Sequence, residues 1–255
     1  MREYGLGRIL FAVSFAILGA LSIGIHGFAL TFPMVPKWIA WHDALSTLFG
    51  AILLVGGVGL LVPRAARISA LLLAGSLLLR LLWIKLPHVA AHPLVEVVWE
   101  DMSENLIFVA GGWTIFSLLP REGGPLVRLG NVRVGQILFA LALPAIGLSH
   151  MFYLAQTAPL IPAWIPFHVP LAYFTGAAYI AAAVAILSGV LARLAATLTA
   201  VMVSLFTLIV WVPIIMAAPS NLGDWSEFWV SAAISGSAWA VAESFRLSPW
   251  TWRRS

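Results

Sequence analysis

Residues 66–86 read ARISALLLAGSLLLRLLWIKL, and residues 192–212 read ARLAATLTAVMVSLFTLIVWV. Each stretch is about as long as the helix that a bilayer core of about 30 Å requires, and each is mostly apolar. The two stretches lie 126 positions apart, and the same spacing relates residues 36–113 to residues 162–239 without a gap. A shared period over this length indicates a duplicated structural unit.

The composition of the chain is typical of an integral membrane protein. Hydrophobic residues make up 62% of the chain and charged residues 9%, whereas soluble domains carry about 25% charged residues. We therefore predict an all-α membrane protein with eight transmembrane helices. The apolar runs that predict these helices are residues 9–31, 44–62, 67–86, 103–120, 134–156, 169–188, 191–217 and 228–245.

Each copy of the repeat contributes four of these runs. Because four is an even number, both copies should enter the membrane the same way up, related by an axis along the membrane normal. We expect two parallel-repeat four-helix bundles lying side by side. Their bounds are residues 1–122 and 134–255, and residues 123–133 form the linker between them.

The distribution of lysine and arginine predicts the orientation. If the N-terminus is cytoplasmic, eleven arginines fall on the inner side and only Lys37 and Lys85 on the outer side, in agreement with the positive-inside rule. Both termini should then be cytoplasmic. The net positive charge of the chain follows from this topology. Because the sequence has no separate basic domain, we do not expect nucleic-acid binding. The inner arginines are Arg2, Arg8, Arg64, Arg67, Arg121, Arg128, Arg133, Arg193, Arg246, Arg253 and Arg254.

The chain contains no cysteine. Thiol–disulfide exchange, iron–sulfur ligation and zinc sites built on cysteine are therefore excluded for this polypeptide alone.

Two histidines occupy equivalent positions in the two copies. His42 and His168 each follow a Pro-x-Trp-Ile segment at the outer mouth of a predicted span. They can form a paired site that passes protons to a bound quinone or lipid headgroup, or each can cap the next helix. Asp101 and Glu227 are the matching acids on the same side, and they either orient the histidines or interact favourably with a helix N-terminus.

The first copy carries further polar residues that the second lacks. Arg80 lies within a predicted span, so it should face protein or water and have a partner. Glu104 and Glu100 are the candidates, and the alternative is that Arg80 extends to the outer interface. His88 and His92 have the spacing of metal ligands on a helix, but the flanking prolines favour an extended loop, and we expect no metal site.

Several short segments in order along the second copy resemble the DoxX family of small four-helix bacterial membrane proteins. They are Gly147–His150 (GLSH), Ile161–Pro166 (IPAWIP), Gly176, Leu191–Ala196 (LARLAA) and Pro213. The resemblance implies a tandem fusion of two DoxX-like units in the bacterial inner membrane. It also implies a link to redox assemblies, because some members are similar to membrane subunits of thiosulfate:quinone oxidoreductases. It brings no catalytic residues to this chain.

Three functions remain open from the sequence. The first is an auxiliary membrane protein whose outer face binds a lipid-soluble ligand or a partner subunit. The second is the membrane subunit of a quinone-linked oxidoreductase, with quinone as the cofactor and a redox subunit as partner. The third is a transporter of small molecules or lipids, which a kink at Pro144 in the fifth run would suit. No cofactor can be assigned from the residues alone.

Overall fold

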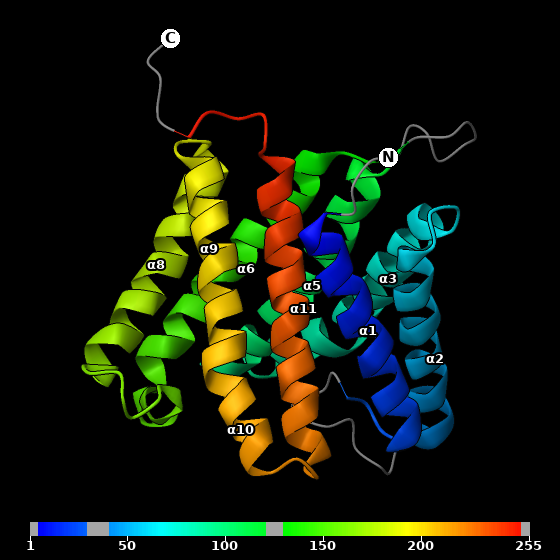
Figure 1. The fold of residues 1–255 in the computed structure, drawn as a ribbon, viewed down its shortest axis with the longest axis horizontal. Coiled ribbons are helices and arrows are strands. Elements are labelled where there is room, and N and C mark those ends of the chain that lie inside the picture. The colour runs from blue at the N-terminus through cyan, green and yellow to red at the C-terminus, as the bar shows by residue number, and fades with distance from the viewer. Residues whose placement is uncertain (1–4, 30–40, 121–129, 251–255) are drawn as a thin grey trace.

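The computed structural model describes residues 5–29, 41–120 and 130–250, which form helices, turns and loops without any strand. Eight long helical segments account for most of these residues (Figure 1). The first four are α1 (Leu6–Gly24), α2 (His42–Leu61), α3 (Ala66–Arg80) with its continuations η1 (Leu81–Lys85) and α4 (Leu86–Ala91), and α5 (Glu96–Leu118).

The remaining four long segments lie after residue 130. They are α6 (Val132–Phe152), α8 (His168–Ser188), α9 (Ala192–Phe206) with its continuations η4 (Thr207–Trp211) and α10 (Val212–Ala217), and α11 (Leu222–Ser244). Two short elements, α7 (Leu154–Thr157) and η3 (Ala158–Leu160), separate α6 from α8. The helix α6 runs without interruption through Pro144.

Six of the eight segments are long and apolar enough to cross a membrane: α1, α2, the continuous helix over residues 66–91, α6, α8, and the continuous helix over residues 192–217. This confirms the prediction of an all-α chain and is consistent with a multi-pass membrane protein. The helices α5 and α11 have 23 residues each and are also long enough. They are less apolar, because acidic residues occupy their first turns.

Those acidic first turns correct the predicted bounds of two helices. The apolar runs predicted starts near residues 103 and 228, but α5 begins at Glu96 and α11 at Leu222. A helix can begin before its apolar run begins, because polar side chains in its first turns can face protein or water. As a result Glu100 and Asp101 lie within α5, and Glu227 lies within α11.

Helix bounds recur at the spacing found in the sequence. The helices α2, α3 and α5 begin 126 residues before α8, α9 and α11, and the π-helical turns η1 and η4 are related in the same way. Each π-helical turn precedes a proline, Pro87 or Pro213. Proline has no N–H to donate and its ring crowds the preceding turn, and a wider π-turn accommodates both effects.

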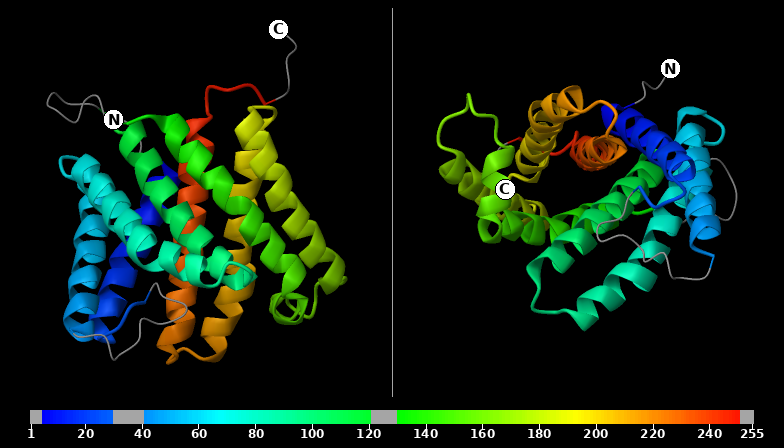
Figure 2. Two further views of the ribbon diagram at one scale, coloured as in Figure 1. Left: turned by 180° about the vertical axis from the view of Figure 1, so that it is seen from behind. Right: turned by 90° about the horizontal axis from the view of Figure 1, so that it is seen from below.

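Helices of the two halves are interleaved. The first helix of each half packs on the fourth helix of the other: α1 contacts α2 and α11, and α6 contacts α8 and α5. The helices α5 and α11 also contact each other at the centre (Figure 2). Both hydrophobic clusters combine residues from the two halves. This packing differs from the expected pair of self-contained bundles lying side by side.

Glycine allows two of these helix pairs to approach closely. A Cβ atom on Gly19 or Gly50 would collide with backbone across the α1–α2 crossing, and one on Gly147 or Gly176 would do so across the α6–α8 crossing. Small residues at such crossings bring helix backbones into direct contact, which is how helices associate in an apolar environment.

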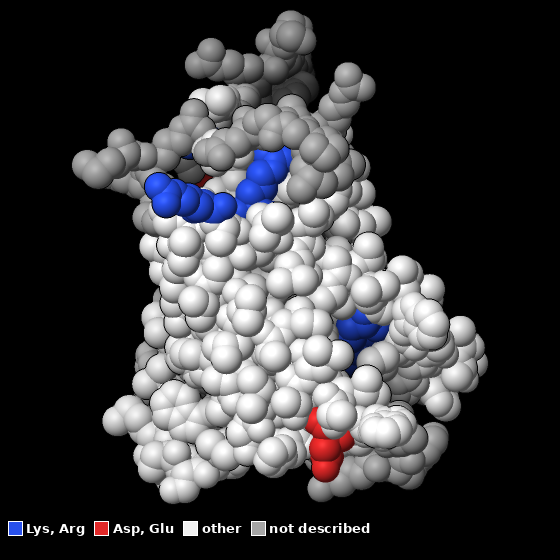
Figure 3. Space-filling model, turned by 90° about the vertical axis from the view of Figure 1, so that its right-hand side faces the viewer, with Lys and Arg blue, Asp and Glu red and all other residues white. Residues whose placement is uncertain are grey.

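One end of the molecule is rich in arginine. There Arg8 donates from Nε to the Leu60 carbonyl at 2.7 Å, and Arg133 donates to the carbonyls of Ile186 and Leu187 at 2.9 and 2.7 Å. These arginines satisfy carbonyls at the C-terminal ends of α2 and α8. Figure 3 shows basic atoms near this end of one face, a second basic patch recessed lower on the same face, and an acidic side chain near the other end.

We expect Gly176→Ala to lower the free energy of unfolding by about 1–3 kcal/mol, because the added methyl group overpacks the α6–α8 crossing. Gly75 is the matched control, since a Cβ atom there meets nothing within 4 Å. Gly75→Ala should be neutral or stabilising, because alanine favours helix over glycine. Thermal denaturation in detergent checks both variants, and equal behaviour of the two would contradict the close crossing.

Candidate functional site

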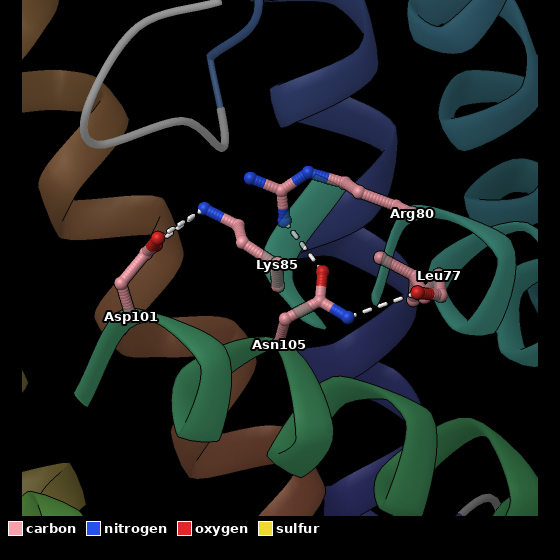
Figure 4. Close-up of polar contacts among 5 residues, drawn as sticks. All are labelled: Leu77, Arg80, Lys85, Asp101 and Asn105. Carbon is pink, nitrogen blue, oxygen red and sulfur yellow. Dashed lines mark hydrogen bonds and ion pairs between the residues drawn. The ribbon is translucent and has the colours of Figure 1, made fainter. Parts of the chain in front are cut away.

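A buried ion pair connects the third and fourth long helices of the first half. Lys85 Nζ lies 2.5 Å from both carboxylate oxygens of Asp101, and the Lys85 side chain is only 2% exposed (Figure 4). Lys85 comes from η1 and Asp101 from the second turn of α5. A pair with this little solvent contact requires both charges, since either one alone would be buried without compensation.

Arg80 extends the same cluster by one turn of α5. Its Nη1 donates to Asn105 Oδ1 at 2.6 Å, and Asn105 Nδ2 in turn donates to the Leu77 carbonyl at 2.9 Å (Figure 4). Arg80 and Asn105 are 6% and 1% exposed. We call Arg80, Lys85, Asp101 and Asn105 the basic cluster.

The basic cluster refines two predictions. Arg80 faces protein, as one of the two alternatives required, and its Nη1 donates to Asn105, a partner that the sequence did not suggest. Lys85 was assigned only to the outer side of the membrane, and the structure shows that it is also buried against Asp101. The sequence could have indicated this burial, because Lys85 lies inside the apolar run 67–86, where a charged side chain needs a partner.

A cavity of about 220 Å³ lies between α5 and the helices of the second half. Its wall is formed by α5, α6, α8, α9 with η4, and α11, together with residues of α7 and η3. Its lining residues on α5, α8 and α11 begin at the second turn of each helix. Most of its lining is apolar, and its largest side chains include Phe139, Leu143, Ile146, Val203, Phe206 and Trp211.

The charged side chains that line the cavity are acidic. Glu100, Glu104 and Glu227 all line it, and none of the described lining residues is a lysine or arginine. Ser149 donates to Glu100 at 2.8 Å. Glu104 is half-buried, and no hydrogen bond or ion pair to it occurs among the described residues. Three carboxylates around a largely apolar space give it a negative potential, which favours a proton or a cation there.

Two further polar groups reach the cavity from α8 and α6. Tyr179 is 5% exposed, and within the described part of the chain its hydroxyl makes no hydrogen bond. His150 lies beside it with ring centroids 5.5 Å apart, and its Nδ1 lies 2.7 Å from the Ile146 carbonyl.

The two repeated histidines lie outside this cavity. His42 and His168 are the first residues of α2 and α8, which occupy opposite flanks of the molecule (Figure 1). His42 Nδ1 lies 3.0 Å from Asp43, and its ring meets Phe28 edge-on. Asp101 pairs with Lys85 and Glu227 lines the cavity, and no hydrogen bond joins either acid to a histidine in the described ranges. The structure therefore does not bring these four residues into one site.

His88 and His92 lie at the end of the third long segment. The expected extended loop is wrong for His88, which belongs to α4, where Pro87 is accommodated in the first turn. The two imidazole rings are 5.1 Å apart. In the ranges 5–29, 41–120 and 130–250, no group of three or more His, Asp or Glu residues is placed to hold a metal ion. Residues 36–40 of the repeated loop lie outside these ranges.

Comparison of the chain with models of protein families, with curated proteins and with solved structures gave no match.

We expect Lys85→Met to lower the free energy of unfolding by about 3–5 kcal/mol, because it leaves Asp101 buried without its counter-charge. The double variant Lys85→Met/Asp101→Asn should recover most of this loss, since it removes both charges together. Thermal denaturation in detergent measures both. A double variant as unstable as the single one would show that the ion pair is not the cause.

Proposed function

We propose that the chain is an integral inner-membrane protein of the DoxX-like kind that binds a lipid-soluble small molecule in the cavity between α5, α6, α8, α9 and α11. The observation that carries this proposal is the cavity itself, which is predominantly apolar and has polar groups at a few positions. Sites for small molecules in proteins have this composition. The role that we propose is auxiliary: the protein binds the molecule and does not transform it.

The cavity differs from the site that the repeated histidines suggested. Ligand binding would depend on Glu100, Glu104, Glu227 and Tyr179 rather than on His42 and His168. These cavity residues lie near the end that we assign to the outer face, so the outer-face location of the binding site is retained.

We further propose that all eight long segments cross the membrane and that the halves arose by duplication of a four-helix unit. The recurring helix bounds and the paired glycine crossings support duplication. The polar residues near the starts of α5 and α11 do not prevent these helices from crossing, because they face protein or the cavity. Asp101 and Asn105 bond to Lys85 and Arg80. Glu100, Glu104 and Glu227 line the cavity. The arginine-rich end would be cytoplasmic.

The absence of cysteine makes the topology directly testable with single introduced thiols. Leu247 is 93% exposed beyond the end of α11, and Ser220 is exposed in the turn before it. In intact cells, a membrane-impermeant maleimide should label Ser220→Cys and leave Leu247→Cys unlabelled until the membrane is opened. Labelling of Leu247→Cys in intact cells would contradict the proposed orientation.

Filling the cavity should release its ligand. Val203 lines the cavity and is 4% exposed, whereas Val201 on the same helix is 38% exposed and does not line it. We expect organic extracts of purified wild type and Val201→Phe to contain a co-purifying molecule by mass spectrometry. The extract of Val203→Phe should contain much less of it.

Val210→Phe, at a less buried lining position, repeats the experiment in case Val203→Phe does not fold. Equal extracts from all these proteins would overturn the proposed site. Recovery of a quinone would instead favour the alternative function, the membrane subunit of a quinone-linked oxidoreductase.

A further inference from the structure

The cavity and the basic cluster occupy corresponding places in the two halves. At the spacing of 126, Arg80 and Lys85 correspond to Phe206 and Trp211, and Asp101 and Asn105 correspond to Glu227 and Ser231. The four residues of the first half form the basic cluster. The four residues of the second half all line the cavity.

The basic cluster of the first half therefore shows which kind of group can be held at the position that the cavity occupies in the second half. There the acid on the second turn of the fourth helix holds a primary ammonium group, that of Lys85, at 2.5 Å. In the second half the corresponding acid is Glu227, which is exposed and lines the cavity, and Trp211 stands at the position of the lysine. The carboxylate therefore has no lysine facing it from that position.

Two further polar groups line the same cavity without a hydrogen-bond partner in the described part of the chain. They are the Tyr179 hydroxyl, on a side chain 5% exposed, and the carboxyl of the half-buried Glu104. Both groups are therefore open to hydrogen bonding by a molecule that enters the cavity. An ammonium group donates three hydrogen bonds and accepts none, which matches an acceptor set of two carboxylates and a phenol oxygen.

The remainder of the wall is suited to an apolar body attached to that charge. Phe139, Leu143 and Val203 provide aliphatic and aromatic surface, and Phe206 and Trp211 provide rings that also attract a cation. We propose, building on the function proposed above, that the cavity binds an amphiphilic primary amine. Its ammonium group occupies the place of the Lys85 ammonium, between Glu227 and Glu104, and its apolar body lies against the aromatic wall.

Three probes of similar size and different charge test this assignment. 4-Phenylbutylamine, 4-phenylbutanol and 4-phenylbutyrate each have a phenyl ring on a four-carbon chain, and they carry a positive, a neutral and a negative head. Binding of each labelled probe to the full chain in nanodiscs, by scintillation proximity, gives a dissociation constant. We expect the amine to bind at least about tenfold more tightly than the alcohol, as expected for charge-assisted hydrogen bonds, and the butyrate to bind most weakly.

Variants of the acids provide the first control. Glu104→Gln and Glu227→Gln should each weaken binding of the amine by about tenfold or more, with little change for the alcohol. Asp224 lies on α11 one turn before Glu227, bonds to Asn221 and does not line the cavity. Asp224→Asn should therefore leave the binding of all three probes unchanged.

Trp211→Lys provides a second, independent test, because it installs at the cavity the lysine that the first half has at position 85. Its ammonium should pair with Glu227 and abolish binding of the amine. Trp211→Met, which opens the same space without a charge, should retain binding, and thermal denaturation checks that both variants fold.

The failure of this inference can be distinguished from failure of the proposed function. Equal binding of amine, alcohol and butyrate, or undiminished amine binding by Trp211→Lys, would overturn the assignment of an amine while leaving a ligand cavity. If none of the probes binds, the amine assignment is also overturned. The extraction experiment with Val203→Phe then decides separately whether the cavity holds a ligand at all.

Discussion

A charge inside an apolar helix bundle needs a partner within the protein, and this constraint explains the position of α5. Residues four apart lie on one face of a helix, so Asp101 and Asn105 form one polar stripe and Glu100 and Glu104 form the neighbouring one. The first stripe is directed to Lys85 and Arg80, and the second to the cavity. Since α5 contacts α3, α6 and α11, it connects the basic cluster of the first half with the cavity of the second.

The two halves share helix bounds and glycine crossings but differ in side chains at one corresponding place. In the first half this place contains the ion pair of Lys85 and Asp101, which connects η1 with α5. In the second half it contains Trp211 and Glu227 beside a cavity. The same backbone spacing therefore holds an ion pair in one half and borders a cavity in the other.

Interleaving of the halves explains why the cavity combines residues from both. Because α6 packs on α5, Glu100 and Glu104 of the first half face Ser149, Tyr179 and Glu227 of the second. A self-contained second bundle would lack two of the three carboxylates. The acidity of the cavity is thus a consequence of packing across the boundary between the halves.

The sequence by itself determined the helical class, the positions of the apolar segments and the spacing of the repeat, since these depend on hydropathy and on comparison of the chain with itself. It also indicated that Arg80 would either be buried with a partner or extend to the interface, because a charge in an apolar run has few other possibilities. Only the tertiary structure decided which partner, and which polar residues meet. Lys85 with Asp101, and Glu104 with Glu227 and Tyr179, are brought together by helix crossings and by the early starts of α5 and α11. Whether these residues or the two histidines come together depends on how the helices are rotated and packed. The periodicity of the sequence does not specify this packing.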